Sequence, residues 1–89
     1  MINDNRIMDI GIAKVFGRVI RRQRKIQGIS QANLAERSGL HLNTIFFIEK
    51  GNDTKLSTQY FIAKGLGVSL SDLLKQTLEE YNVTNSKNS

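Results

Sequence analysis

One short stretch of the chain carries the polar side chains whose types and spacing suggest chemistry. Between Ser30 and Gly51, His41 is followed by Asn43, and Lys50 comes about two helical turns later. An asparagine amide can pair with adenine through two hydrogen bonds, and a lysine can neutralise a DNA phosphate. The chemistry that these residues suggest is non-covalent recognition of duplex DNA.

The composition argues against an enzyme. The 89 residues include one histidine and no cysteine, so neither a nucleophile with its base and orienting group nor a metal cluster can be assembled. We expect no catalytic activity, no metal and no cofactor. Thirteen Lys and Arg residues against eight Asp and Glu residues give a net charge of +5, which favours a polyanionic partner.

Two short helices joined by a turn must position these side chains. Ser30 is a good N-cap for the first helix, and Gly39 ends that helix by adopting a left-handed conformation. The second helix runs from about Leu42 to Lys50 and is ended by Gly51. A helix, a tight turn with glycine and a second helix is the arrangement that lays one helix in the major groove of DNA.

The flanking sequence predicts three further helices. We expect one at about residues 9–27, one at about residues 57–64 with Ser57 as its N-cap, and a last one that starts at Ser69 or Ser71. The chain contains no proline, so no helix is interrupted by one. The predicted fold class is all-α, with five helices.

The length and composition predict one domain with polar ends. Residues 1–9 are expected to form a flexible N-terminal extension, with an extra turn of the first helix as the alternative for residues 1–7. Residues 10–81 are expected to form the DNA-binding domain with a C-terminal dimerisation helix, and residues 82–89 a disordered tail. No apolar run is long enough to span a membrane, and the N-terminus lacks the apolar segment of a signal peptide. A cytoplasmic protein is therefore expected.

The run FGRVIRRQRKIQGISQANLAERSGLHLNTIFFIEKG, followed by LSTQYFIAKGLGVSLSDLL, resembles the lambda-repressor-like (XRE-type) helix-turn-helix family. The resemblance covers about Val15 to Leu74, and its matching positions are spread along that range. They are Phe16, Ile20, Arg24, Gly28, Ser30, Gln31, Leu34, Ala35, Gly39, Ile45, Ile48, Glu49, Gly51, Ile62, Ala63, Leu66, Gly67 and Val68. The resemblance implies a transcriptional regulator with a five-helix fold.

Two charged residues are expected to hold the first helix against the second helix of the motif. Helical arithmetic places Arg24 on the flank of the apolar face, away from the other basic side chains of its helix. A buried charge must be paired, and arginine suits a bidentate contact with a carboxylate, for which Glu49 is the expected partner. The resemblance implies the same ion pair, with a structural role.

Contacts with DNA are expected from both helices of the motif and from basic residues beside them. Gln31 lies at a helix N-terminus, which can bind a phosphate, and the resemblance implies this contact over the alternative of an ordinary first-turn glutamine. Asn43 is the best candidate to read a base, while Leu42 and Thr44 can contact a thymine methyl or a phosphate. His41 is expected to cap the helix or to contact a phosphate. The residues predicted to contact DNA are Arg21, Lys25, Gln31, His41, Leu42, Asn43, Thr44, Phe47, Lys50, Asn52 and Lys55.

Exposed aromatic residues depart from the pattern of the resembled family, where polar residues usually fill the positions of Leu42, Phe46 and Phe47. We expect one phenylalanine to tuck against a neighbouring helix and the other to read thymine methyls or contact a partner. The sequence leaves open which phenylalanine has which role. Phe61 also lies at a position that is more often polar, which suggests another contact surface.

The last two helices are expected to complete the core and to provide a dimer contact. Leu56 and Tyr60 are predicted to line the core together with Ile62, Ala63 and Leu66, and Gly65 and Gly67 to end their helix. In the last helix, Leu74, Leu78 and Tyr81 form a stripe that reaches past the core. A symmetric dimer interface is the favoured interpretation, and a slightly longer core helix is the alternative.

These features predict a sequence-specific regulator that binds double-stranded DNA as a homodimer on a palindromic operator and is autoregulatory. The short architecture is similar to that of phage repressor or Cro-like proteins and of restriction-modification controller proteins. The Gly-Leu-His run before the second helix of the motif favours the controller proteins. The alternative is an antitoxin or other protein-binding module of the same fold. A further expected partner is RNA polymerase for a regulator or a toxin for an antitoxin. No membrane partner is expected.

Overall fold

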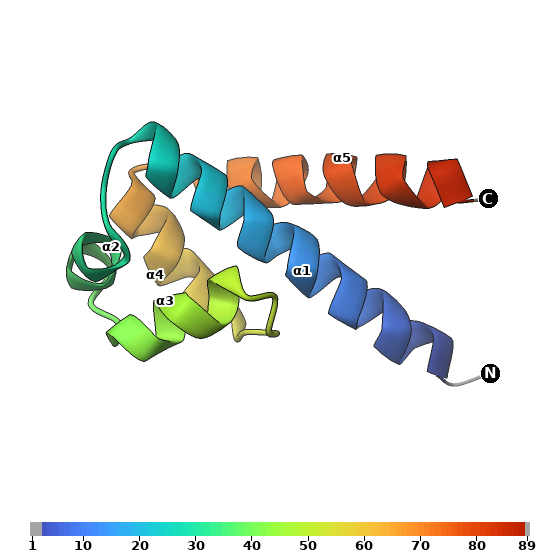
Figure 1. The fold of residues 1–89 in the computed structure, drawn as a ribbon, viewed down its shortest axis with the longest axis horizontal. Coiled ribbons are helices and arrows are strands. Elements are labelled where there is room, and N and C mark those ends of the chain that lie inside the picture. The colour runs from blue at the N-terminus through green and yellow to red at the C-terminus, as the bar shows by residue number, and fades with distance from the viewer. Residues whose placement is uncertain (1–2, 89) are drawn as a thin grey trace.

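Five helices make up the fold in the computed structural model, which describes the backbone of residues 3–88 and the side chains of residues 11–84. The helices are α1 (Asn3–Ile26), α2 (Gln31–Ser38), α3 (Leu42–Glu49), α4 (Leu56–Leu66) and α5 (Leu70–Asn88), and the described residues contain no strand. Figure 1 shows α2, α3 and α4 gathered at one end of α1, with α5 beside it. The predicted all-α, five-helix fold is confirmed.

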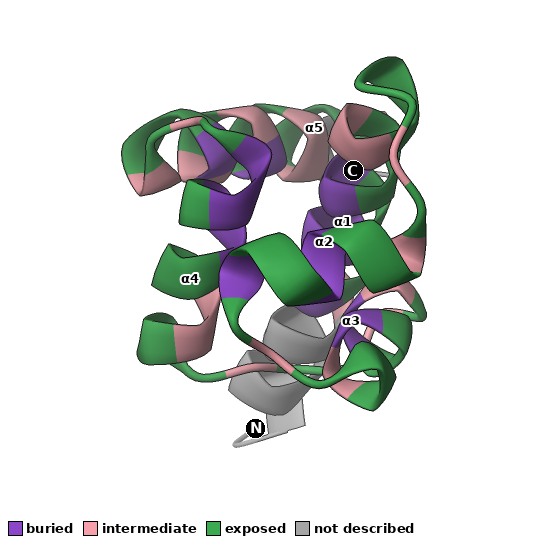
Figure 2. Cartoon of the chain, turned by 90° about the vertical axis from the view of Figure 1, so that its left-hand side faces the viewer, coloured by how far each residue is buried: buried purple, intermediate pink, exposed green. Residues whose placement is uncertain are grey.

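One apolar core joins the helices. Val19 and Ile20 of α1 are fully buried, as the helical spacing of its apolar residues predicts. The core consists of Val15, Phe16, Val19, Ile20, Leu34, Ala35, Ile45, Ile48, Ile62, Ala63, Leu66 and Leu73. In the pairing of the helices, α2 packs against α4 and α3, and α1 packs against α5 and α3. Figure 2 shows the buried parts of α1, α2 and α4 turned toward the centre of the molecule.

The predicted cap and stop signals of α2 are present. The Ser30 hydroxyl accepts a hydrogen bond from the Asn33 backbone N–H at 3.0 Å, and the Asn33 side chain bonds back to Ser30. At the other end, Gly39 has a φ of 69° and donates its N–H to the carbonyls of Ala35 and Glu36. The left-handed turn at Gly39 redirects the chain into α3.

A close crossing sets the distance between α1 and α3. Gly17 is buried, and a Cβ atom at that position would lie 2.3 Å from the carbonyl oxygen of Ile48. Only a glycine lets the two backbones approach this closely. The absence of a side chain at Gly17 therefore brings α3 directly onto α1.

Both terminal helices are longer than expected. The first helix begins at Asn3 rather than near Asp9, and the last helix continues to Asn88 through residues that were expected to form a tail. Neither residues 3–10 nor residues 82–88 contain a glycine or a proline, so nothing in their backbone chemistry ends the helix. Residues 1, 2 and 89 lie outside the described residues.

The prediction for α4 is wrong in its start and in part of its buried face. Lys55, not Ser57, occupies the N-cap position, and Gly65 lies inside the helix, buried against Ser38 of α2. Leu56 and Tyr60 were expected in the core but are 68% and 50% exposed. The reason is the phase of the helix, because at about 100° per residue they lie roughly 100° and 140° from the centre of the buried face.

None of the helices in residues 3–88 is long and apolar enough to cross a membrane.

Candidate nucleic-acid interface

The helix α3 presents one side to the core and the other to solvent. Ile45 and Ile48 are buried, whereas Asn43, Phe47 and Lys50 are exposed. At 3.6 residues per turn these three exposed residues form a single row along the outer face, one helical turn apart. Among the large apolar residues of the same helix, Leu42 is 49%, Phe46 42% and Phe47 55% exposed. The predicted base reader, Asn43, therefore lies in the outermost row, beside Phe47.

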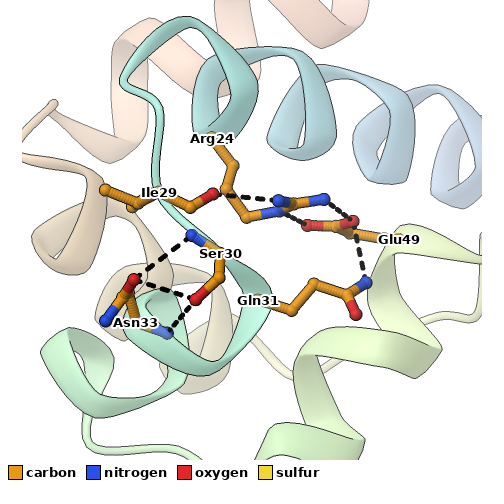
Figure 3. A network of polar contacts seen from close by, with 6 residues as sticks. All are labelled: Arg24, Ile29, Ser30, Gln31, Asn33 and Glu49. Atoms are coloured by element: carbon orange, nitrogen blue, oxygen red, sulfur yellow. Dashed lines mark hydrogen bonds and ion pairs between the residues drawn. The ribbon is translucent and has the colours of Figure 1, made fainter.

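A buried ion pair holds α3 in this orientation, as predicted. Arg24 Nε donates to Glu49 Oε2 at 2.6 Å, and Arg24 Nη2 donates to Glu49 Oε1 at 2.9 Å. The two side chains are only 11% and 5% exposed. The third guanidinium nitrogen, Nη1, donates to the Ile29 carbonyl at 3.0 Å, so the same arginine also fixes the α1–α2 loop (Figure 3). These hydrogen bonds to Glu49 raise the pKa of Arg24.

The side chain of Gln31 extends the ion pair to α2. Its Nε2 donates to Glu49 Oε1 at 3.1 Å, so Gln31 points toward α3 (Figure 3). Glu49 therefore accepts hydrogen bonds from α1 and α2 while it belongs to α3. The Gln31 amide lies at the junction of the three helices. The phosphate contact expected of this side chain stays a prediction.

An open cleft of about 350 Å³ lies at this junction. It is lined by Arg21, Arg24, Gln31, Phe46, Glu49 and Lys50. The carboxylate of Glu49 is held by Arg24, which leaves Arg21 and Lys50 as the further cations at its walls. Two cations that line an open cleft, one on α1 and one at the end of α3, can neutralise a phosphate group that approaches the helix junction.

The structure separates the roles of the two phenylalanines. Lys50 Nζ lies 4.6 Å from the centre of the Phe46 ring, a cation–π contact at the wall of the cleft. The Phe47 ring lies 6.4 Å away from that of Phe46 and is tilted by 54°. Phe46 therefore supports Lys50, and Phe47 is the phenylalanine that projects from the outer row. The spacing of four residues between Phe46 and Lys50 was a signal for this contact that sequence reasoning missed.

Residues at the two ends of α3 have mainly structural contacts. His41 is the N-cap, but its side chain makes no capping bond; its carbonyl accepts from the N–H groups of Thr44 and Ile45. Asn52 was expected to reach the DNA backbone, and its Nδ2 donates to the Phe47 carbonyl at 3.0 Å. Asn52 thus helps to end α3. Lys55 is exposed at the start of α4.

The basic residues of α1 do not all face the cleft. Arg21 lines both this cleft and a second open groove of about 520 Å³, whereas Lys25 lines the second groove together with Arg18, Arg22 and Ile26. Arg22 is bonded to Glu80 of α5 through both of its terminal nitrogens, and the Nη2–Oε1 distance is 2.9 Å. These hydrogen bonds lower the pKa of Glu80. This second ion pair, 58 residues apart in sequence, had no signal in the spacing of charges.

The predicted dimer residues of α5 are unequally exposed. Leu74 and Tyr81 are half-buried and pack against the core of their own chain, whereas Leu78 is 49% exposed. Thr77, in the same stripe, is buried and donates to the Leu73 carbonyl at 2.8 Å. Much of the stripe is therefore covered within the chain, and Leu78 is the residue of the predicted interface that projects furthest.

A second exposed apolar surface on α4 was only partly foreseen. The rings of Tyr60 and Phe61 lie 5.7 Å apart in an edge-to-face arrangement, and Phe61 is 43% exposed, as its unusual position suggested. Leu56 lies near the start of the same helix and is also exposed. We call Leu56, Tyr60 and Phe61 the α4 surface. It belongs to a different helix from the row of Asn43 and Phe47.

Comparison with known sequences places the motif within a family of known proteins. The helix-turn-helix family model matches residues 20–73, from the second half of α1 to the start of α5. Control protein C.SmaI of Serratia marcescens is 38% identical to this chain over 72 residues, which are 80% of this chain and 86% of that protein.

Solved structures show the same likeness. The restriction-modification controller protein C.AhdI of Aeromonas hydrophila is similar with a TM-score of 0.66 and 29% identity, over 68% of this chain and 94% of that one. The controller protein C.Esp1396I gives a TM-score of 0.71 and 27% identity, over 78% and 91% of the two chains. The clp gene regulator ClgR of Corynebacterium glutamicum, at 19% identity and a TM-score of 0.78 over 86% and 83% of the chains, shares the fold.

Proposed function

The chain belongs to the helix-turn-helix family, and on that premise we propose that it is a sequence-specific, double-stranded DNA-binding transcriptional regulator of the restriction-modification controller type. We propose further that it acts as a homodimer on a palindromic operator and regulates its own expression. The relatives named as control or controller proteins support this assignment.

The observation that carries the proposal is the outer row of α3. Asn43, Phe47 and Lys50 project together from a helix whose other side is locked to α1 by the Arg24–Glu49 pair. A major groove admits one helix, and a helix can read bases only if its outer side chains are held in register. The rigid attachment of α3 supports direct reading of bases by this row.

Cations beside the row support binding to the sugar–phosphate backbone. Arg21 and Lys50 line the cleft at one end of α3, and Lys55 is exposed in the segment that follows it. Each phosphate that these side chains neutralise releases counterions, which strengthens binding at low salt without selecting a sequence. Arg21, Lys50 and Lys55 therefore account for affinity, and Asn43 for base selection.

The dimer would place two copies of α3 in successive major grooves, about 34 Å apart. We propose the exposed part of α5 around Leu78 as the contact between the copies. Leu78 is 49% exposed, and Leu74 and Tyr81 are half-buried against the core of their own chain. A twofold contact of this kind matches the symmetry of a palindromic site.

A binding experiment tests the function. Fluorescence anisotropy with duplex DNA from upstream of the gene, and with a scrambled duplex of equal composition, should show tighter binding to the former at several salt concentrations. Asn43→Ala should lose about 1–3 kcal/mol of discrimination between the two duplexes. Lys50→Ala should weaken both and lower the salt slope by about one. Lys64→Ala, which removes an exposed positive charge from α4, is the matched control. Equal binding to both duplexes at every salt concentration would reject the proposal.

The α4 surface favours a second candidate function, a protein-binding module such as an antitoxin. Tyr60 and Phe61 form an exposed aromatic pair outside the row of α3, and aromatic residues are enriched in protein interfaces. Phe61→Asp should leave DNA binding and dimerisation unchanged if this surface serves another protein. Loss of the dimer in Phe61→Asp would assign the surface to the second copy instead.

A further inference from the structure

The side chain of Phe47 is left largely exposed on the outer face of α3, with a tilted Phe46 ring 6.4 Å away. It is 55% exposed, and its neighbours in the outer row are the amide of Asn43 and the ammonium of Lys50. The neighbouring Phe46 ring is already engaged by Lys50 at 4.6 Å. An aromatic ring held outward in the row that would enter the groove must meet something apolar there, or it removes water from polar base edges without replacing their hydrogen bonds.

The major groove offers a single kind of apolar group on unmodified bases. Guanine, cytosine and adenine present hydrogen-bond donors and acceptors on that side, whereas thymine adds its C5-methyl group to an acceptor. A phenyl ring can donate no hydrogen bond and accept none of normal strength. Among the four bases, the chemistry of Phe47 therefore suits thymine.

We propose that Phe47 is a specificity-determining residue that packs on a thymine C5-methyl group in each operator half-site, within two base pairs of the adenine read by Asn43. The two residues are four positions apart, which is about 6 Å along the helix at 1.5 Å per residue, a little under two base-pair rises of 3.4 Å. This assignment rests on the proposed function and names the base chemistry that the same interface selects.

The charges around Phe47 favour a polyanionic partner over a protein surface for this ring. Lys50 lies in the same row, and Arg21 lines the same cleft as Lys50. Of the two nearest carboxylates in sequence, Glu49 is bonded to Arg24, and Asp53 accepts a hydrogen bond from the Thr54 N–H in the loop after α3. The ring is thus set among cations whose neighbouring acids are already bonded, which is the environment that faces DNA.

Replacement of thymine by uracil tests the assignment, because it removes the methyl group and nothing else. The operator identified by the binding experiment is synthesised with each thymine of the half-site replaced in turn, symmetrically in both half-sites. Burial of one methyl group corresponds to about fourfold in affinity, so two half-sites give about fifteenfold. At one or two positions, the wild-type protein should lose about that factor, and at the remaining thymines it should lose little.

Variants of the two adjacent phenylalanines make the test specific. Phe47→Ala should bind the thymine and uracil duplexes equally at the sensitive position, while Phe47→Leu, which keeps an apolar side chain, should retain part of the difference. Phe46→Ala is the matched control and should keep the full sensitivity to uracil, because its ring supports Lys50. Circular dichroism shows that each variant is folded before its affinity is measured.

The outcomes separate this inference from the function on which it rests. Specific binding to the operator with no loss at any uracil position would overturn the role of Phe47 and leave DNA recognition intact. The same conclusion would follow if Phe47→Ala kept the sensitivity to uracil. Binding that does not distinguish the operator from scrambled DNA would instead overturn the proposed function itself.

Discussion

Replacing Gly17 with alanine should push the reading helix away from α1. A Cβ atom at Gly17 would lie 2.3 Å from the carbonyl oxygen of Ile48 and 3.2 Å from that of Glu49. Since Cβ atoms essentially never approach closer than 3.0 Å, the backbones would have to separate by about 0.7 Å, the difference between 3.0 and 2.3 Å. The atoms in conflict belong to helix backbones, so no flexible side chain can yield in their place.

The expected change in stability is the balance of two terms. Alanine in a helix interior is favoured over glycine by about 0.8–1 kcal/mol. Overpacking typically costs about 1–3 kcal/mol, and a clash between two backbones belongs at the upper end of that range. We therefore expect Gly17→Ala to lose about 1–2 kcal/mol net. A domain of this length has a total stability of about 4–13 kcal/mol, so the variant should still fold.

Gly11→Ala is the matched control in the same helix. It gains the same helix propensity, but its Cβ atom would meet only the ring atom Cε1 of Tyr81, at 3.2 Å, and an aromatic ring can shift. We expect it to be as stable as the wild type or up to about 1 kcal/mol more stable. Urea unfolding followed by circular dichroism measures both variants, and DNA binding should weaken in Gly17→Ala alone. If Gly17→Ala proved as stable as Gly11→Ala, the close crossing of α1 and α3 would be refuted.

Three further predictions concern the ion pairs and the last helix. Arg24→Leu should lose about 3–5 kcal/mol in urea unfolding because it leaves Glu49 buried without its partner, and the double variant with Glu49→Leu should lose less than the sum; strict additivity would contradict a buried pair. Because the pKa of Glu80 is lowered, the folded state binds fewer protons than the unfolded state just below pH 4.5. The contribution of the pair with Arg22 to the free energy of unfolding is therefore present above that pH. It is lost as the pH falls through the pKa of Glu80 in the folded state. This contribution should stay below about 1 kcal/mol because both side chains are well exposed, and a pH titration of stability in Glu80→Gln should lack it; identical pH profiles would argue against the pair. Leu78→Glu should shift sedimentation equilibrium toward the monomer without lowering the monomer's melting temperature, and an unchanged dimer would place the contact elsewhere.

Features that depend on a few neighbouring residues were predictable. Ser30 and Gly39 begin and end α2 as expected, because capping bonds reach only three or four residues along the chain. The Arg24–Glu49 pair was also predictable, since helical phase placed Arg24 beside the apolar face and the family resemblance named its partner. The outward direction of Asn43 followed from the spacing of Ile45 and Ile48.

Features that depend on which helix packs against which were not predictable. Nothing in the spacing of residues within α1 marks Gly17 as the point at which α3 lies directly on α1. The separate roles of Phe46 and Phe47 were also left open.

The sequence by itself determined the helices of the motif, their caps and the residues that face outward on the reading helix, because these follow from hydrogen bonds and periodicity within a few residues. The tertiary structure alone decided how closely α3 lies on α1, how much of α5 its own chain covers, and which of the two exposed phenylalanines contacts Lys50. The first two outcomes depend on contacts between segments far apart in the chain, and the spacing of residues within one segment carries no information about them.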